Sequence, residues 1–150
     1  MSPKQARHRQ CAGLPYRRRP DATIEIMLIT SRDTGRWLIP KGWPEPGLAP
    51  AEAAAREAYE EGGLIGRIGD RSIGFYRYEK RLPDGSAMHC VVEVFAFEVK
   101  QQATSWPERD ERATRWFVLH EAAEAVHEPE LRAIIRNLTT SALGDDVASC

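Results

Sequence analysis

The chain has 150 residues, which is enough for one domain with a hydrophobic core. A hydrophobic fraction of 42% is ordinary for a globular protein, and a formal net charge of -1 argues against a broadly basic nucleic-acid-binding surface. No apolar run approaches the roughly 20 residues that span a bilayer, and the charged N-terminus does not resemble a secretory signal. We therefore expect a cytoplasmic protein with no membrane partner and no stable nucleic-acid partner.

The sequence contains three cysteines and the features of a single domain. Cys11, Cys90 and Cys150 are odd in number and show no spacing typical of a metal site, so we interpret them as isolated thiols in a reducing compartment. The sequence contains no internal repeat and no linker. We expect a single domain over residues 1–150, with an ordered core at about residues 10–139.

Short strands are expected before residue 41. Residues 10–17 are predicted to form a first strand broken by Pro15, and residues 22–30, rich in β-branched side chains, a second. After a turn at 31–36, residues 37–40 form a short third strand. Arginines occupy the turn between the first two strands. They are either solvated loop charges or the rim of a polyphosphate site, because guanidinium groups match phosphate oxygens.

A helix is predicted next, over residues 51–61. The preceding stretch, residues 40–47, is too rich in Gly and Pro to be helical. Pro50 suits the first helical position, where a missing N–H has no intrahelical partner. The helical residues are mostly Ala, Glu and Arg, which are good helix formers. Gly62 and Gly63 then end the helix, as a left-handed C-terminal cap usually requires.

This helix carries three carboxylates on one face. Glu57, Glu60 and Glu61 are spaced i, i+3 and i+4, so their side chains are neighbours. Such a cluster destabilises a helix unless a cation lies within it, and Mg²⁺ prefers oxygen ligands. Arg56 adjoins this face and is able to hold one carboxylate in place. The alternative, a surface helix with solvated charges, explains neither the cluster nor the flanking loop.

More strands and two helices are expected after residue 63. Residues 64–68 are extended, and residues 74–81 pair as a hairpin with 87–99, whose apolar centre suits a central strand. A polar loop at 101–114 precedes a last strand at 115–119. Helices are predicted at 121–126 and 129–138, the second with an apolar stripe formed by Leu131, Ile134, Ile135 and Leu138.

The segment from residue 42 to residue 64 resembles the Nudix box, G-x5-E-x7-R-E-U-x-E-E-x-G-U, in which U is aliphatic. The matching residues are Gly42, Arg56, Glu57, Glu60, Glu61, Gly63 and Leu64. Two positions depart from the pattern: Leu48 stands where the box has its first Glu, and Ala58 stands where it has a bulkier aliphatic residue. In the family that Glu mainly braces the loop and the start of the helix. Glu45 or Glu52 is a candidate for this bracing role.

The resemblance implies the Nudix α/β/α sandwich, with a mixed β-sheet and the loop–helix–loop of the box, over about residues 10–139. It implies metal-dependent hydrolysis of a pyrophosphate (phosphoanhydride) bond in a nucleoside diphosphate linked to another group. The outer segments resemble the diphosphoinositol polyphosphate phosphohydrolase branch, which also cleaves diadenosine polyphosphates. A small-molecule polyphosphate of one of these two kinds is therefore the expected substrate.

Other functions within the same resemblance stay open. One is a pyrophosphatase acting on nucleoside triphosphates, nucleotide sugars or RNA 5′ ends. Another is a non-catalytic, nucleotide-sensing Nudix domain, although such domains often lose the box glutamates that are retained here. The sequence is equally compatible with a monomer and a homodimer.

The resemblance also assigns roles to residues. The expected catalytic residues are Glu57, Glu60, Glu61 and Arg56, with the three glutamates binding Mg²⁺, or alternatively Mn²⁺, and Arg56 orienting Glu57. Glu111 is expected as a further ligand from a later loop. The general base stays open between Glu60 or Glu61 and the loop residues Glu111 and Glu108. The expected substrate-binding residues are Arg17, Arg18, Arg32, Arg36, Lys41, Gly42, Lys80, Arg81 and Arg115.

Overall fold

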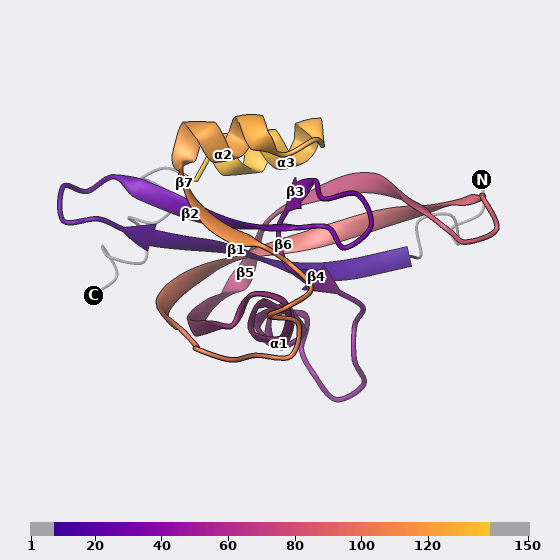
Figure 1. Cartoon of the computed structure of the whole chain (residues 1–150), viewed down its shortest axis with the longest axis horizontal. Coiled ribbons are helices and arrows are strands. Elements are labelled where there is room, and N and C mark those ends of the chain that lie inside the picture. Colours follow the sequence, from indigo (N-terminus) through magenta and orange to yellow (C-terminus); the bar gives the residue numbers. More distant parts are fainter. Residues whose placement is uncertain (1–7, 139–150) are drawn as a thin grey trace.

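The computed structural model describes residues 8–138, which form a mixed β-sheet between two helical layers (Figure 1). Helix α1 (Pro50–Gly62) covers one face of the sheet, and α2 (Leu119–Ala125) and α3 (Pro129–Arg136) cover the other. The predicted α/β/α sandwich with a mixed sheet is thus confirmed. Residue 139, the predicted end of the core, and Cys150 lie outside the described residues.

Seven strands make up the sheet: β1 (His8–Arg18), β2 (Ile24–Thr30), β3 (Trp37–Leu38), β4 (Lys41–Gly42), β5 (Leu64–Arg81), β6 (Ala87–Gln102) and β7 (Thr114–Val118). Five of them follow the order β3-β2-β1-β6-β5, while β4 pairs with β1 and β7 pairs with β2. The β1–β6 pair is parallel and the other described pairs are antiparallel. Strand β6 is an interior strand, paired with β1 on one side and with β5 on the other, whereas the central position expected for it is held by β1.

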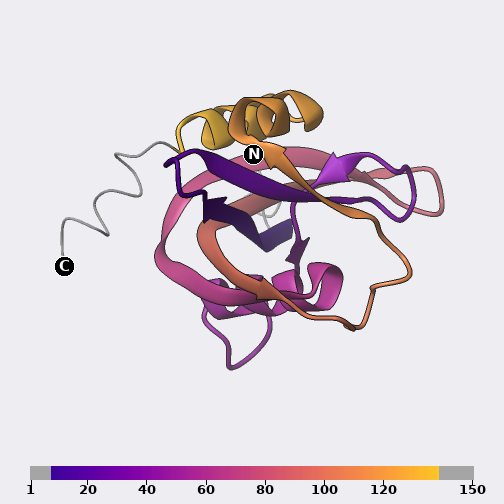
Figure 2. The ribbon, with the colours of Figure 1, turned by 60° about the vertical axis from the view of Figure 1, so that its left-hand side comes forward.

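One long strand replaces two predicted segments. Residues 64–68 and 74–81 belong to a single strand, β5, which pairs with β6 over most of its length. The register shifts near Ile68, Ser72 and Gly74, and these irregularities absorb the residues that seemed to interrupt the strand. Because such bulges bend a strand, β5 and β6 curve strongly between the helical layers (Figure 2).

The predicted break at Pro15 is wrong. Strand β1 runs through this residue, and its parallel register with β6 places Pro15 opposite Phe97. On its other side β1 changes partner here, from β4 at Cys11 and Ala12 to β2 from Tyr16 onward. A proline is tolerated in a strand where a ladder hydrogen bond is not required, and its fixed φ is compatible with extended backbone.

Helix α1 begins and ends where its sequence indicates. Pro50 occupies the first turn, and Gly63 ends the helix in the left-handed region with φ 69°. The side chain of Glu52 accepts a hydrogen bond from the Ala49 N–H at 2.8 Å. Small buried residues, Ala53, Ala54 and Ala58, face the sheet, so the helix axis can approach the strands closely.

Apolar side chains fill both sides of the sheet. Under α2 and α3, the predicted stripe of α3 is buried together with residues of β1, β2 and β6. Under α1, the alanines pack against Cys11, Phe95, Met27 and Phe97. Cys11 and Cys90 are free, buried thiols. Within residues 8–138, no helix is long and apolar enough to cross a bilayer.

Candidate active site

The strand β4 brings the Gly- and Pro-rich loop beside helix α1. Lys41 and Gly42 pair with Ala12 and Cys11 of β1, at the centre of the sheet. The chain then makes a loop and enters α1 at Pro50, so the residues that precede the helix in sequence lie against its side. This places the loop backbone next to the helix face that carries the carboxylates.

Glu57 and Glu61 lie one helical turn apart and their carboxyl groups are hydrogen-bonded to each other. Burial raises the pKa of Glu57, and burial also raises the pKa of Glu61, to about 8, although the nearby Arg112 lowers it. Only 6% of Glu61 is exposed. The pair therefore retains a proton near neutral pH in the absence of a cation.

Gly42 allows the loop backbone to lie against the carboxyl groups of Glu57 and Glu61. A β-carbon at residue 42 would overlap the carboxyl group of Glu57. The next contact is made by the Lys41 N–H, which donates a hydrogen bond to Oε1 of Glu61 at 3.3 Å. The loop backbone thus contacts both carboxyl groups, and the expected role of Gly42, a close backbone approach, agrees with this geometry.

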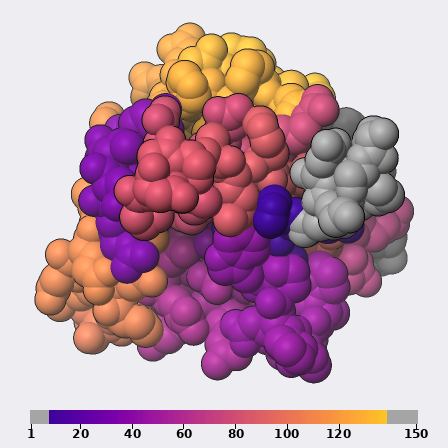
Figure 3. Space-filling model, turned by 90° about the vertical axis from the view of Figure 1, so that its right-hand side faces the viewer, coloured from indigo at the N-terminus to yellow at the C-terminus, as the bar shows by residue number. Residues whose placement is uncertain are grey.

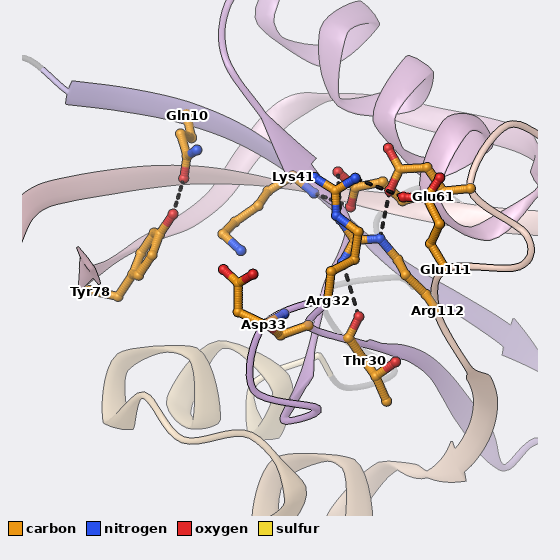
Figure 4. A network of polar contacts seen from close by, with 11 residues as sticks. Gln10, Thr30, Arg32, Asp33, Lys41, Glu61, Tyr78, Glu111 and Arg112 are labelled. Atoms are coloured by element: carbon orange, nitrogen blue, oxygen red, sulfur yellow. Dashed lines mark hydrogen bonds and ion pairs between the residues drawn. The ribbon is translucent and has the colours of Figure 1, made fainter. Parts of the chain in front are cut away.

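Arg112 is the principal residue that the sequence did not single out. Its side chain is 9% exposed and its Nε donates to Oε1 of Glu108 at 2.7 Å. Its Nη1 donates to the carbonyl of Thr30 at 2.9 Å, and its Nη2 lies 3.8 Å from Oε2 of Glu61 (Figure 4). In the sequence it was one of five consecutive charged residues, and nothing marked it as the buried one.

The loop that carries Glu108 and Arg112 is attached to the C-terminal end of α1. The N–H of Glu108 donates to the carbonyl of Glu60 at 3.0 Å, and the N–H of Ala103 donates to that of Gly63 at 2.8 Å. The amide of Gln102 donates to the Gly62 carbonyl at 2.9 Å. These bonds satisfy carbonyls that a helix end leaves without partners. They also fix the loop relative to the carboxylates of α1.

Arg56 does not make the contact expected of it. Its Nη1 lies 2.8 Å from Oε1 of Glu45, and its Nε lies 3.3 Å from Oε2 of Glu60. The expectation that Arg56 holds Glu57 is therefore corrected, because the i, i+4 partner of Arg56 on the helix is Glu60 rather than its neighbour. Glu45, whose side chain ties the loop to the helix, fills the bracing role for which it was a candidate.

Two adjoining cavities open beside these residues. The first, of about 260 Å³, is lined by residues that include Glu57, Glu61, Glu108 and Arg112, and we call it the carboxylate pocket. The second, of about 770 Å³, is lined by residues that include Tyr76 and Tyr78, and we call it the tyrosine groove. Both are lined by Leu38, Lys41, Tyr78 and Lys80, so they are continuous.

Lys41 stands between the two cavities. Its ammonium lies 4.9 Å from the centre of the Tyr78 ring, and the Tyr78 hydroxyl donates to Oε1 of Gln10 at 2.6 Å. Burial lowers the pKa of Lys41, while the carboxylates of Glu61 and Glu128 raise it. The Lys41 side chain thus lies among protein groups, beside the Tyr78 ring and near the carboxyl groups of Glu61 and Glu128. Figure 3 looks onto the molecule from another side, where the residues after β2 (purple) border both the β5–β6 hairpin (pink) and the loop before β7 (orange).

The basic residues expected to bind substrate fall into two groups. Five of them line the carboxylate pocket or the tyrosine groove: Arg32, Arg36, Lys41, Lys80 and Arg81. The other three do not line either cavity. Arg17 stacks on Trp116 at 4.0 Å and pairs with Glu25, Arg115 lies over Phe117, and Arg18 lies over Tyr16.

The glutamates expected as metal ligands or as the general base differ in their position relative to the carboxylate pocket. Glu108 lines the carboxylate pocket. Glu111 pairs with Arg32 at 2.8 Å on the surface, where about half of each side chain is exposed. Glu60 is turned toward Arg56. Glu111 and Glu60 thus lie beside the pocket, each engaged by an arginine.

The residues present are suited to a divalent metal ion. Among residues 8–138, no group of three His, Cys, Asp or Glu side chains is already arranged to bind a metal ion. Glu57 and Glu61 nevertheless offer hard oxygen donors whose pKa values are raised, so a cation is able to replace the proton between them. At Gly42 the absence of a side chain leaves the backbone directly beside the carboxyl group of Glu57.

Comparisons with known proteins agree with this geometry. A family model described as the NUDIX domain matches residues 7–138. Nudix hydrolase 16, mitochondrial, of Arabidopsis thaliana is 32% identical over 115 residues, which are 73% of this chain and 62% of that protein. Diphosphoinositol polyphosphate phosphohydrolase 3-alpha of Mus musculus is 30% identical over 116 residues, 74% of this chain and 66% of that one. The chain spans less than two thirds of the length of these relatives.

A solved structure of similar fold is that of a C. elegans Ap4A hydrolase binary complex. It has a TM-score of 0.66 and 19% identity, and the alignment covers 91% of this chain and 98% of that one. At this level of identity the likeness concerns the fold. The match of the NUDIX model to every described residue, including all those of the carboxylate pocket, shows that this chain belongs to the Nudix family.

Proposed function

We propose that this chain hydrolyses a phosphoanhydride bond in a polyphosphate substrate, either a dinucleoside polyphosphate or a diphosphoinositol polyphosphate, with the help of a divalent metal ion. The observation that carries the proposal is the buried Glu57–Glu61 pair, which faces the loop backbone at Gly42 in a pocket also lined by cations. Buried paired carboxylates beside basic residues suit phosphoryl chemistry better than they suit packing.

Glu57 and Glu61 would hold the metal ion, and Glu60 would join them after turning away from Arg56. A bound Mg²⁺ or Mn²⁺ supplies charge neutralisation on phosphoryl oxygens and lowers the pKa of a bound water. Arg112 fixes the position of Glu108 and lies near Glu61, so it holds the two carboxyl groups in a constant relation to the pocket.

Phosphate oxygens are proposed to contact Lys41, Lys80 and Arg32, which line the carboxylate pocket. Their charges oppose the repulsion between the substrate and the glutamates. The attacking water needs a proton acceptor within reach. Glu108 and Glu61 line the pocket and are the proposed acceptors, whereas Glu111 and Glu60 are not among its lining residues.

The relatives support the substrate class. The mouse relative is named as a diphosphoinositol polyphosphate phosphohydrolase, and it is matched over 74% of this chain. The Arabidopsis relative is named as mitochondrial, and the cytoplasmic location expected for this chain remains a prediction.

The test is Mg²⁺-dependent hydrolysis of a substrate panel, with EDTA as the metal-free control. The panel contains a diphosphoinositol polyphosphate, diadenosine penta- and hexaphosphate, nucleoside triphosphates, ADP-ribose and triphosphorylated RNA. Turnover of the first three compounds supports the proposal. Turnover of another member alone keeps the chemistry and overturns the substrate class. An absence of turnover with every divalent ion identifies a binding domain.

A further inference from the structure

The tyrosine groove lies directly beside the carboxylate pocket and is about three times as large. Its volume of about 770 Å³ lies within the range of roughly 300–1,000 Å³ that is usual for small-molecule sites. Because the two cavities are continuous, a substrate whose phosphoanhydride bond lies in the carboxylate pocket can extend one of its attached groups into this groove. The lining of the groove therefore restricts what that group can be.

The groove is not a uniformly basic surface. Its cations are Arg36, Lys41, Lys80 and Arg81, and its acids are Asp33, Glu79 and Glu128. Figure 4 shows the Asp33 carboxylate pointing toward the ammonium of Lys41. The cations are thus nearly balanced by carboxylates on the same walls. A ring that carries phosphate on nearly every carbon would bring its anionic groups against these acids, which is unfavourable.

Glu128 contributes most clearly to this balance. It occupies the N-cap position of α3, yet its side chain makes no capping hydrogen bond. The side chain lines the groove instead, and its charge acts on Lys41, Tyr76 and Tyr78. A Glu in this position is not required by the helix, because the cap that the helix would use is left unmade. It is available for recognition.

The remaining walls suit a group that is flat and uncharged. Tyr76 and Tyr78 line one side, and apolar contacts come from Leu38, Leu82 and Pro83. Burial raises the pKa of both tyrosines, so the phenols stay uncharged. Carboxylates accept hydrogen bonds from ribose hydroxyls and from base amino groups. A nucleoside offers all of these complementary features.

We propose that the tyrosine groove is a nucleoside subsite, and that Asp33 and Glu128 make the chain select a dinucleoside polyphosphate over a diphosphoinositol polyphosphate. This inference rests on the proposed function, because it assumes that the phosphoanhydride bond is cleaved at the carboxylate pocket. It assigns a selective role to two acids, one before β3 and one at the start of α3, that are far apart in the sequence.

The experiment compares kcat/KM for diadenosine pentaphosphate with kcat/KM for diphosphoinositol pentakisphosphate. The proteins are the wild type, Asp33→Asn, Glu128→Gln, the double variant, and the control Glu124→Gln, an exposed residue of α2. The wild type is expected to favour the dinucleotide. Removal of one like charge should shift the ratio toward the inositol substrate by about tenfold, the equivalent of 1.4 kcal/mol of repulsion. Glu124→Gln should leave the ratio unchanged.

Binding of the products gives a second readout that does not depend on turnover of either substrate. In calorimetric titrations AMP should bind the wild type more tightly than inositol hexakisphosphate does, and Glu128→Gln should reverse or reduce this preference. Thermal melting identifies any variant that has not folded, and Glu128→Asp then serves as the second variant, because it keeps the charge and should keep the preference.

The outcomes separate the two proposals. A wild type that hydrolyses both compounds but favours the inositol substrate, with a ratio unaffected by Asp33→Asn and Glu128→Gln, overturns the nucleoside subsite and leaves the proposed function intact. A wild type that hydrolyses neither compound with any divalent ion overturns the proposed function itself. A shift of the kcat/KM ratio toward the inositol substrate in Asp33→Asn and Glu128→Gln, but not in the control Glu124→Gln, supports the nucleoside subsite.

Discussion

At the scale of single residues, burial changes the protonation of Glu57 and Glu61, the two carboxyl groups of the candidate metal site. Two carboxylates at this spacing repel each other, yet they lie hydrogen-bonded to each other because burial raises the pKa of both groups. The folded protein thus binds a proton more tightly at Glu61 than the unfolded chain does. For metal-free protein, the stabilisation from this group is present below its ordinary pKa of 4.5 and is lost as the pH rises toward about 8.

The affinity for Mg²⁺ should therefore depend on pH. Between about pH 6 and pH 8, the cation must displace the proton of Glu61, so the affinity should rise by about tenfold per pH unit and level off above that range. Calorimetric titration at pH 7, in buffers of different ionisation enthalpy, should show the release of close to one proton per ion. Glu61→Gln should abolish this pH dependence. An affinity that is constant from pH 6 to pH 8 would contradict the assignment.

Arg112 should be important for stability as well as for the site. It is almost fully buried and contacts Glu108, Glu61 and the Thr30 carbonyl. Arg112→Gln leaves buried acceptors without a partner, so the free energy of unfolding should fall by about 2 to 3 kcal/mol. Urea denaturation measures this change. The control is Arg109→Gln, an exposed residue of the same loop, and an equal effect of both substitutions would argue against the role of Arg112.

At the scale of elements, the attachment of the loop before β7 to α1 depends on Gly63. This residue has φ 69°, and a β-carbon there would overlap the ring of Trp106. Gly35 has a similar φ of 73° but nothing within 4 Å of its β-carbon position. Both alanine variants should lose about 1 to 2 kcal/mol from backbone strain. Gly63→Ala should lose more, and its kcat should fall because Glu108 and Arg112 move with the loop.

Circular dichroism melts and steady-state kinetics on the Gly63→Ala and Gly35→Ala pair measure this difference. If Gly35→Ala lowers stability and kcat as much as Gly63→Ala does, the contact with Trp106 has no part in positioning the loop. The comparison removes the common cost of the left-handed backbone, which both variants share.

At position 48 the family pattern has a Glu that braces the loop and the helix, whereas this chain has Leu48. It packs against the cluster of Cys11, Ala53, Ala54 and Phe95, and Glu45 makes the contact with Arg56. Leu48→Glu should therefore lower the free energy of unfolding by about 1 to 2 kcal/mol and should not raise kcat. Leu48→Met, which conserves volume, should be nearly neutral. A rise of kcat in Leu48→Glu would show that the brace at Glu45 is incomplete.

The elements were predictable where the chemistry is local. The start of α1 at Pro50 and its end at Gly63 follow from residues at those positions, and the apolar stripe of α3 follows from its spacing. The continuity of β5 was not predictable, because its bulges depend on pairing with β6. The passage of β1 through Pro15 likewise depends on which neighbour lies at that point, a property of the whole sheet.

At the scale of the whole molecule, the carboxylate pocket gathers residues from five separate parts of the chain: residue 10, residues 32–43, 57–61, 78–80 and 108–112. The box provides Glu57, Glu61 and Gly42, whose spacing carries the information locally. Arg112 was not predictable, because its burial results from packing between the β2 end and the loop before β7. The separation of the arginines into those lining the cavities and those stacked on aromatic rings, such as Arg17 on Trp116, also depends on tertiary contacts.

The central claim is that Glu57 and Glu61 serve metal-dependent cleavage of a phosphoanhydride bond. The most direct test follows the hydrolysis of diadenosine pentaphosphate while Mg²⁺ is titrated, for the wild type, Glu61→Gln and the exposed control Glu124→Gln. We predict saturable Mg²⁺ activation of the wild type and the control, and a loss of kcat of about 100-fold or more in Glu61→Gln, with an unchanged fold by circular dichroism. Equal turnover by Glu61→Gln, or turnover that persists in EDTA, would contradict the claim.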